Sequence, residues 1–271
     1  MKFILELRNL LFPKKNMNLA LVAPLNPISR GIPVPTKNME VGCGTCSKCE
    51  DTCPTDAIEK NNKEEIKFDY GMCIQCGICS QICSENKLID SGFVYVFGLN
   101  RNELAVNYKN GKIQIENNFK LTQNQIAFQK LTKRSGFLYR EVACGGNNTV
   151  ESELNASFNS VFDSEREGVR SVASPKHADA IVFSGSVTRN MEKAFDKAYR
   201  VMNEPKALIA CGTEAISGGF FQMGKKPVEP DLYIAGDPPR PDVILQGFRL
   251  LMGRIQFRFQ IELQKFLESS L

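Results

Sequence analysis

Eight of the ten cysteines of this chain lie between positions 43 and 83, in two copies of one spacing. The first copy is Cys43-x-x-Cys46-x-x-Cys49-x-x-x-Cys53, followed by Pro54, and the second is Cys73-x-x-Cys76-x-x-Cys79-x-x-x-Cys83. Three thiolates with this spacing can hold one iron–sulfur cube, and the fourth turns away to ligate the other cube. We therefore expect two 4Fe-4S clusters, one held by Cys43, Cys46, Cys49 and Cys83 and the other by Cys73, Cys76, Cys79 and Cys53.

A zinc site and a disulfide framework are the rival interpretations of these cysteines. Zinc ribbons favour two C-x-x-C knuckles over three evenly spaced cysteines followed by a fourth. The N-terminal stretch does not read as a signal peptide, because Glu6 and Arg8 interrupt it. We therefore expect a cytoplasmic chain, in which reducing conditions keep the thiols available for metal.

Length and charge narrow the remaining possibilities. A chain of 271 residues is long enough for two domains of about 150 residues each. No apolar run approaches the ~18 residues that a membrane span requires. The net charge is only +4 and the basic residues are scattered, which argues against a nucleic-acid partner.

The N-terminal half divides into three expected parts. Residues 1–40 read as an amphipathic helix followed by a proline-rich extended strap, and the helix suits a membrane surface, a partner subunit or its own domain. Residues 41–90 form the two-cluster module, of the α+β type. In it, Ala57-Ile58 and Leu88-Ile89 follow the two cysteine runs at similar places, as an internal duplication predicts. Residues 91–135 are polar and mixed, and we expect a linker with a strand near Phe93 and a helix near Leu121.

Residues 136–255 alternate between strand and helix patterns, which predicts an α/β domain with a parallel sheet. The expected strands are Leu138–Val142, Val169–Ala173, Ala180–Phe183, Ala207–Ala210 and Leu232–Ala235. The expected helices are Val150–Phe162, Arg189–Met202 and Asp242–Phe257. A last amphipathic helix, in residues 256–271, either seeks another subunit or packs across the two-cluster module.

Several motifs of the C-terminal half resemble the small iron–sulfur subunit of energy-converting nickel–iron hydrogenases and the related subunit of complex I. The motifs are Ser174-Pro175-Lys176-His177-Ala178-Asp179, Phe183-Ser184-Gly185-Ser186-Val187-Thr188, Glu204-Pro205-Lys206, Ser217-Gly218-Gly219 and Pro238-Pro239-Arg240-Pro241. The N-terminal half is similar to the two-cluster ferredoxin subunit of the same complexes, which include formate hydrogenlyase. A fusion of the two subunits therefore covers nearly the whole chain.

The resemblance implies a function and a set of partners. It implies a bacterial 2x 4Fe-4S ferredoxin module followed by an α/β domain of the hydrogenase-small-subunit or flavodoxin-like kind. It also implies a redox subunit of an oxidoreductase complex, peripheral on the cytoplasmic side of a membrane and not catalytic alone. Its partners would be a hydrogenase-like or complex I-like large subunit, membrane-arm subunits and a redox protein.

The chain departs from the family where the family binds a third, proximal cluster. The resemblance places the four cluster cysteines at Gly145, Asn148, Glu214 and Asp237, and none of these is a thiol. A one-residue insertion would instead put Cys144 and Asn147 on the first two positions. In either alignment most ligands are missing, and glycine and asparagine are poor substitutes for thiolate. We therefore expect no proximal cluster.

Two cysteines remain near that position. Cys144 and Cys211, with Glu214 and Asp237, either form a site for a single metal ion such as zinc or fill a collapsed pocket. No nucleophile–base pair accompanies them, so we expect no catalytic residues. Two functions remain open: an electron-transfer subunit, or an architectural adaptor whose C-terminal half only holds a large subunit or a membrane arm.

Overall fold

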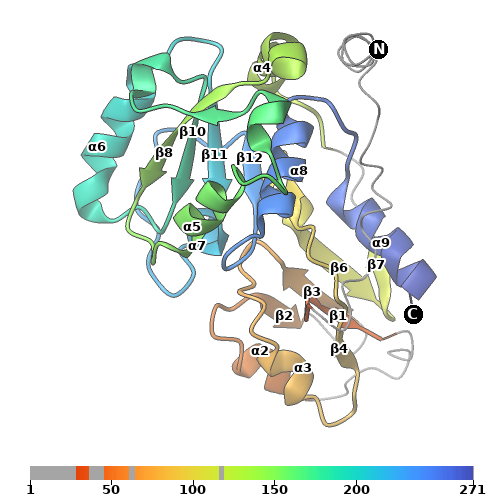
Figure 1. The fold of residues 1–271 in the computed structure, drawn as a ribbon. Coiled ribbons are helices and arrows are strands. Elements are labelled where there is room, and N and C mark those ends of the chain that lie inside the picture. The colour runs from red at the N-terminus through yellow and green to blue at the C-terminus, as the bar shows by residue number, and fades with distance from the viewer. Residues whose placement is uncertain (1–28, 37–45, 61–64, 116–118, 271) are drawn as a thin grey trace, which may run out of the picture.

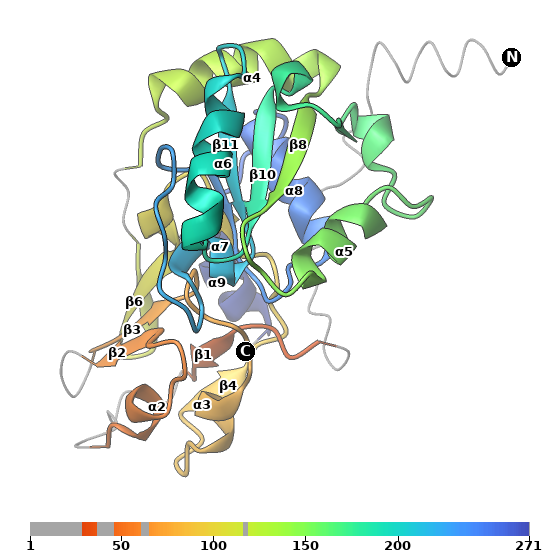
Figure 2. The same ribbon diagram turned by 90° about the vertical axis from the view of Figure 1, so that its left-hand side faces the viewer.

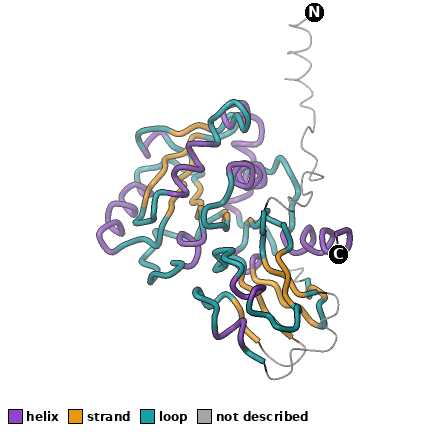
Figure 3. The backbone as a smooth tube through the Cα atoms, turned by 60° about the horizontal axis from the view of Figure 1, so that its bottom comes forward, coloured by secondary structure: helices purple, strands orange, loops and turns teal. Residues whose placement is uncertain are grey.

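The structure is a computed structural model, and it describes residues 29–36, 46–60, 65–115 and 119–270 (Figure 1). The expected N-terminal helix and Cys43 lie outside the described residues. The described chain forms two stacked units, whose strands appear as two separate groups in Figure 3. We call them the α/β domain and the cysteine-rich unit, the latter being formed by β1 to β4, β6, β7, α2 and α3.

The α/β domain is built on a six-stranded sheet with the order β5-β12-β11-β10-β8-β9. Its strands are β5 (Phe97–Gly98), β8 (Leu138–Ala143), β9 (Arg170–Ser171), β10 (Ala180–Ser184), β11 (Ala207–Cys211) and β12 (Leu232–Ile234). All pair in parallel except β5, which is antiparallel to β12. Every residue of β10 and β11 is buried, as expected of central strands covered on both faces. The parallel sheet predicted from the sequence is confirmed.

Helices cover both faces of this sheet. They are α4 (Gln123–Ser135), α5 (Thr149–Ala156), α6 (Arg189–Arg200), α7 (Thr213–Ser217) and α8 (Pro241–Leu251). Figure 2 shows α6 on one face and α8 on the opposite face. Helix α5 ends at Ala156, before the expected end at Phe162, because Asn159 Oδ1 accepts the backbone N–H groups of Val161 and Phe162 in a turn.

The cysteine-rich unit contains two small antiparallel sheets and two short helices. One sheet has the order β2-β3-β6-β7 and the other pairs β1 with β4. The strands are β1 (Pro33–Pro35), β2 (Ile58–Lys60), β3 (Glu65–Asp69), β4 (Leu88–Asp90), β6 (Ala105–Lys109) and β7 (Lys112–Gln114). The helices are α2 (Lys48–Asp51) and α3 (Ile78–Gln81), each starting within a cysteine run. Thus β2 follows the first run and β4 follows the second.

Residues 91–135, expected as a linker, are divided between the two units. Strand β5 joins the parallel sheet, whereas β6 and β7 extend the antiparallel sheet of the cysteine-rich unit. Val106 and Tyr108 on β6 are fully buried, which explains why this segment packs instead of crossing solvent. Helix α4 begins at a capping box, in which the side chains of Thr122 and Gln125 bond each other's backbone N–H groups.

The last helix, α9 (Phe259–Ser270), packs on the cysteine-rich unit of its own chain. The Phe259 ring lies 5.6 Å from the Tyr70 ring and 6.2 Å from the Phe93 ring, centroid to centroid. The carboxylate of the buried Glu103 accepts the backbone N–H of Phe259 at the start of the helix. No helix in the described ranges is long and apolar enough to cross a bilayer.

Candidate metal centre

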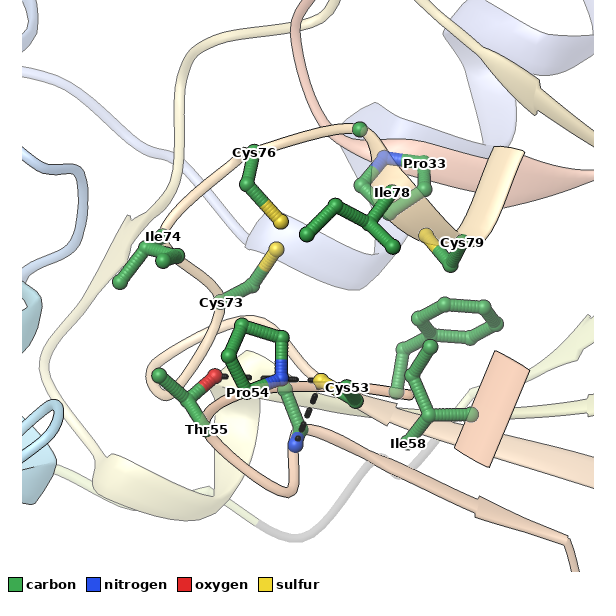
Figure 4. Close-up of a pocket in the computed structure, with 13 residues that line it drawn as sticks. Pro33, Cys53, Pro54, Thr55, Ile58, Cys73, Ile74, Cys76, Ile78 and Cys79 are labelled. Atoms are coloured by element: carbon green, nitrogen blue, oxygen red, sulfur yellow. Dashed lines mark hydrogen bonds between the residues drawn. The ribbon is translucent and has the colours of Figure 1, made fainter. Parts of the chain in front are cut away.

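Cys53, Cys73, Cys76 and Cys79 line one cavity of the cysteine-rich unit (Figure 4). Three of these thiols come from the second run, and Cys53 reaches the cavity from the end of the first run. Figure 4 shows the sulfur atoms of Cys73 and Cys76 turned toward each other. The rest of the wall is largely apolar and includes Pro33, Pro54, Ala57, Ile58, Phe68, Ile74 and Ile78. The residues brought together are therefore one of the two crossed sets expected from the spacing.

The chain after the fourth cysteine has the same local geometry in both runs. The Sγ atom of Cys53 accepts the backbone N–H group four residues later at 3.3 Å, and Cys83 accepts the corresponding N–H at 3.2 Å. Asp56 and Asn86, each three residues after its cysteine, have φ angles of 52° and 50°. Such left-handed backbone is uncommon outside glycine, so its recurrence at equivalent places supports an internal duplication.

The electrostatics of the cavity oppose free thiolates. Burial raises the pKa of the Cys73 thiol to about 12, although the Gln75 N–H group opposes the shift. Burial, and then the nearby Cys53, raise the pKa of Cys79 to about 12. Several thiols in so small a space lose their protons only when a cationic centre binds them. The donor set and its apolar walls therefore fit an iron–sulfur cluster.

Two cations hold the loops that carry the cysteines. The Arg30 guanidinium donates to the backbone carbonyl of Cys76, and the Lys60 ammonium donates to that of Cys46 at 2.6 Å. Arg30 also pairs with Asp90 on β4, at 3.5 Å. These contacts attach both runs to the strands that follow them.

The second crossed set is only partly described. Cys49 and Cys83 are half-buried and Cys46 is exposed, while Cys43 lies outside the described residues. Across the described ranges, no three His, Cys, Asp or Glu side chains are arranged to hold a single metal ion. The four thiolates of a 4Fe-4S cluster bind four different iron atoms, so they need not converge on one point as the ligands of a single metal ion do.

The positions expected to have lost a proximal cluster lie at the carboxyl edge of the parallel sheet. Gly145 follows β8, Glu214 lies on α7 and Asp237 follows β12, and Glu214 alone of the three is half-buried. Asn148 is exposed in a left-handed conformation. Val150 on α5 approaches the loop that follows β11. Its Cγ2 atom would lie 2.7 Å from a Cβ placed on Gly212.

The two remaining thiols are fully buried at the same edge. Cys144 follows β8, and Cys211 is the last residue of β11. Burial and then Glu151 raise the pKa of Cys144 to about 12, and the pKa of Cys211 rises for the same two reasons. The arrangement corresponds to packed, protonated thiols, and they form no single-ion metal site with the described carboxylates.

Sequence reasoning missed Glu151, a residue of α5. This side chain is buried, and its Oε1 atom accepts the hydroxyl of Ser184 at the end of β10. Its Oε2 atom is buried without a hydrogen-bond partner. The sequence did offer a signal for this residue, because Glu151 is a carboxylate on the inward face of a short helix, beside the end of a strand.

The carboxyl edge of the parallel sheet faces the second cysteine run. The Thr213 hydroxyl, at the start of α7, donates to the backbone carbonyl of Cys73 at 3.2 Å. A Cβ placed on Gly71 would meet Arg101 Nη1 at 2.8 Å and Ile216 Cγ2 at 3.1 Å. Helix α7 therefore packs directly against the loop that leads into Cys73.

Comparison with known proteins agrees with this architecture. The family described as "NADH ubiquinone oxidoreductase, 20 Kd subunit" matches residues 144–251. Formate hydrogenlyase subunit 7 of Escherichia coli strain K12 is 40% identical over 134 residues, which is 47% of this chain and 52% of the relative. A subunit of the F(420)H(2) dehydrogenase of Methanosarcina mazei is 35% identical over 129 residues, which is 45% of this chain and 67% of the relative.

The extent of these matches is limited. The chain spans about half the length of the formate hydrogenlyase subunit and of an NAD(P)H-quinone oxidoreductase subunit from a Synechococcus strain, which is 39% identical over 111 residues. A solved structure of the archaeal membrane-bound sulfane sulfur reductase matches with 25% identity and a TM-score of 0.41, over 55% of this chain and 90% of that one.

The fold defines an α/β domain with a parallel sheet, and the matched relatives are subunits of formate hydrogenlyase, an F(420)H(2) dehydrogenase and an NAD(P)H-quinone oxidoreductase. The order of the five parallel strands reverses between β8 and β10, and in open α/β sheets this is where ligands bind. The chain belongs, through this domain, to the NADH ubiquinone oxidoreductase 20 Kd subunit family.

Proposed function

We propose that the chain is an electron-transfer subunit of a membrane-associated oxidoreductase complex and carries two 4Fe-4S clusters. The observation that carries the proposal is the cavity lined by Cys53, Cys73, Cys76 and Cys79. In this cavity the cysteine contributed by the first run belongs to the ligand set that the doubled spacing predicts. The relatives are subunits of formate hydrogenlyase, F(420)H(2) dehydrogenase and quinone oxidoreductases, which supports a role within a larger redox complex.

The residues of the cavity have separable roles in this proposal. The four cysteines would hold one cluster, and Cys43, Cys46, Cys49 and Cys83 would hold the other. When bound, the clusters supply one-electron transfer. Ile58, Phe68 and Ile74 exclude water from the sulfur atoms, and backbone N–H groups donated to sulfur stabilise negative charge on the ligands.

The α/β domain would have a different task. Gly145 and Asn148 offer no strong ligand, and Glu214 and Asp237 replace thiolates with carboxylates. We propose that this domain lacks the proximal cluster and retains a docking role toward a large subunit and membrane-arm subunits, peripheral on the cytoplasmic side. The alternative function is an architectural adaptor, whose C-terminal half only holds a large subunit or a membrane arm.

Replacement by serine of Cys53 or Cys83, the cysteine that each run is expected to contribute to the other cluster, tests the proposal. Cys53→Ser should remove mainly the cluster held by Cys73, Cys76 and Cys79, and Cys83→Ser should remove mainly the cluster of the first run. Paramagnetic resonance of the reduced full-length variants distinguishes the two losses. The matched control is Cys144→Ser, which changes a buried cysteine outside both sets and should leave both signals intact.

Iron analysis separates the remaining alternatives. Two cubes correspond to about eight irons per chain, and a third cube would bring the content to about twelve. An iron-free chain after anaerobic reconstitution would leave only the adaptor function. Loss of the cluster of the mutated run, with the other cluster retained, would refute the crossed ligand sets.

A further inference from the structure

A hydrogen bond joins the two units of the chain at the candidate metal centre. The hydroxyl of Thr213, the first residue of α7, donates to the backbone carbonyl of Cys73 at 3.2 Å. Arg30 and Lys60 also donate to cysteine carbonyls, but both lie in or beside strands of the cysteine-rich unit. Thr213 reaches Cys73 from the α/β domain, so this contact makes the second cysteine run depend on the other half of the chain.

The parallel sheet holds the Thr213 hydroxyl in place. Thr213 is fully buried, and its backbone N–H donates at 2.9 Å to the carbonyl of Gly236, which follows β12. The Gly236 N–H in turn donates to the Thr213 hydroxyl at 3.3 Å. A hydroxyl has one hydrogen and two lone pairs, so a hydroxyl that accepts from Gly236 still has its hydrogen available for Cys73. The donor is therefore fixed to the carboxyl edge of the sheet.

The chain that leads into Cys73 is also held at the end of β3. The Arg101 guanidinium makes two hydrogen bonds of 2.8 Å to the carboxylate of Asp69, the last residue of β3. This carboxylate also accepts the Gly71 N–H at 3.0 Å, and the Asp69 carbonyl accepts the Met72 N–H at 3.0 Å. A bidentate pair of this kind fixes orientation as well as distance. The peptide group of Cys73 is therefore held from both units of the chain.

This contact affects the charge balance around the cysteines. Cys73 lines the cavity, and its Sγ atom accepts the Gln75 N–H at 3.4 Å. A reduced iron–sulfur cluster carries one more negative charge than the oxidised cluster, so donors near its ligands favour the reduced state. The Thr213 O–H group places partial positive charge beside the Cys73 peptide group and acts in the same direction.

We propose that Thr213 is a positioning residue for the cluster of the second run. It fixes the Cys73 peptide group from the α/β domain and raises the reduction potential of that cluster. The inference rests on the proposed function, because it requires a cluster bound to Cys73. It assigns to the α/β domain an influence on electron transfer that needs no cluster in that domain.

Redox titration of the full-length chain, followed by paramagnetic resonance, tests this role. Cys53→Ser and Cys83→Ser identify the signals of the second-run and first-run clusters, respectively. Thr213→Val keeps the branched shape and removes the hydroxyl. It should shift the reduction equilibrium of the second-run cluster toward the oxidised state by at least about threefold, or about 30 mV at about 59 mV per tenfold change. The first-run cluster should be unchanged, and Thr213→Ser, which retains the hydroxyl, should retain the wild-type potential.

Thr132→Val is the matched control. Thr132 is fully buried and donates to the Phe128 carbonyl at 2.8 Å, on α4, which lies at the far end of the molecule from α2 and α3 (Figure 1). Its replacement should leave both potentials unchanged. Far-ultraviolet circular dichroism verifies that each variant is folded. Should Thr213→Val fail to fold, Thr213→Ala removes the same hydroxyl and is judged by the same shift.

The outcomes separate this inference from the proposed function. An unchanged second-run potential in a folded Thr213→Val or Thr213→Ala chain that holds about eight irons would overturn the inference and leave the proposed function standing. Equal shifts of both clusters, or the same shift in Thr132→Val, would also overturn it, because they indicate a general disturbance of the fold. An iron-free wild type would refute the proposed function, and this inference with it.

Discussion

Truncation of Phe259 measures how far α9 belongs to the core of the cysteine-rich unit. Phe259 is fully buried, and its ring contacts those of Tyr70 and Phe93. Replacement of a buried phenylalanine by alanine typically costs 3–5 kcal/mol, from lost transfer free energy and the cavity left behind. With two aromatic partners lost, we expect Phe259→Ala to lower the free energy of unfolding by about 4 kcal/mol.

Urea denaturation of the full chain provides the assay. The sequence has six tyrosines and no tryptophan, so tyrosine fluorescence and far-ultraviolet circular dichroism report unfolding. The matched control is Phe221→Ala, because the Phe221 side chain is 61% exposed and its truncation should change stability by less than about 0.5 kcal/mol. A loss below about 1 kcal/mol in Phe259→Ala, or an equal loss in Phe221→Ala, would refute the packing argument.

Three further outcomes are expected. Burial opposes ionisation of Glu167, but its two arginine partners outweigh burial and lower its pKa, so Glu167→Gln should cost about 2 kcal/mol at neutral pH. This difference should begin to shrink only as the pH falls below the ordinary glutamate pKa of about 4.3, and it should vanish once the pH has passed the lowered pKa of the folded chain; urea titrations at several acidic pH values would detect a difference that fails to shrink. Gly185→Ala should cost more than about 2 kcal/mol in the same assay, because φ is +75° and the new Cβ would lie 2.2 Å from the Gly146 nitrogen; a neutral result would contradict this contact. Cys144 and Cys211 should resist iodoacetamide in the native chain at about pH 8 and react after denaturation, as mass spectrometry can show, whereas labelling of the folded chain would disprove their burial.

Local patterns in the sequence determined the individual elements well. The ranges expected for β8 and β10 each differ from the observed strands by one residue, because a short apolar run bounded by polar residues specifies a buried strand by itself. The doubled cysteine spacing likewise indicated which cysteines would meet, since it repeats a local unit. The four thiols that line the cavity were all named from spacing alone.

Tertiary structure decided the features that depend on distant partners. The expected strand Val169–Ala173 is reduced to Arg170–Ser171, because only these residues pair with β8 at the sheet edge. Strand β5 belongs to the parallel sheet through β12, more than a hundred residues later in the chain, and no local pattern specifies such a partner.

The same distinction applies to the sites. The sequence by itself named the four thiols that line the cavity, because residue type and spacing along the chain are local features. Only the fold decided that Glu151 is buried against Ser184, that the Glu214 carboxylate approaches Gly146, and that α7 contacts the second cysteine run. Burial depends on how separate segments pack, so the surroundings of Glu151 emerge only when the strands and helices are assembled.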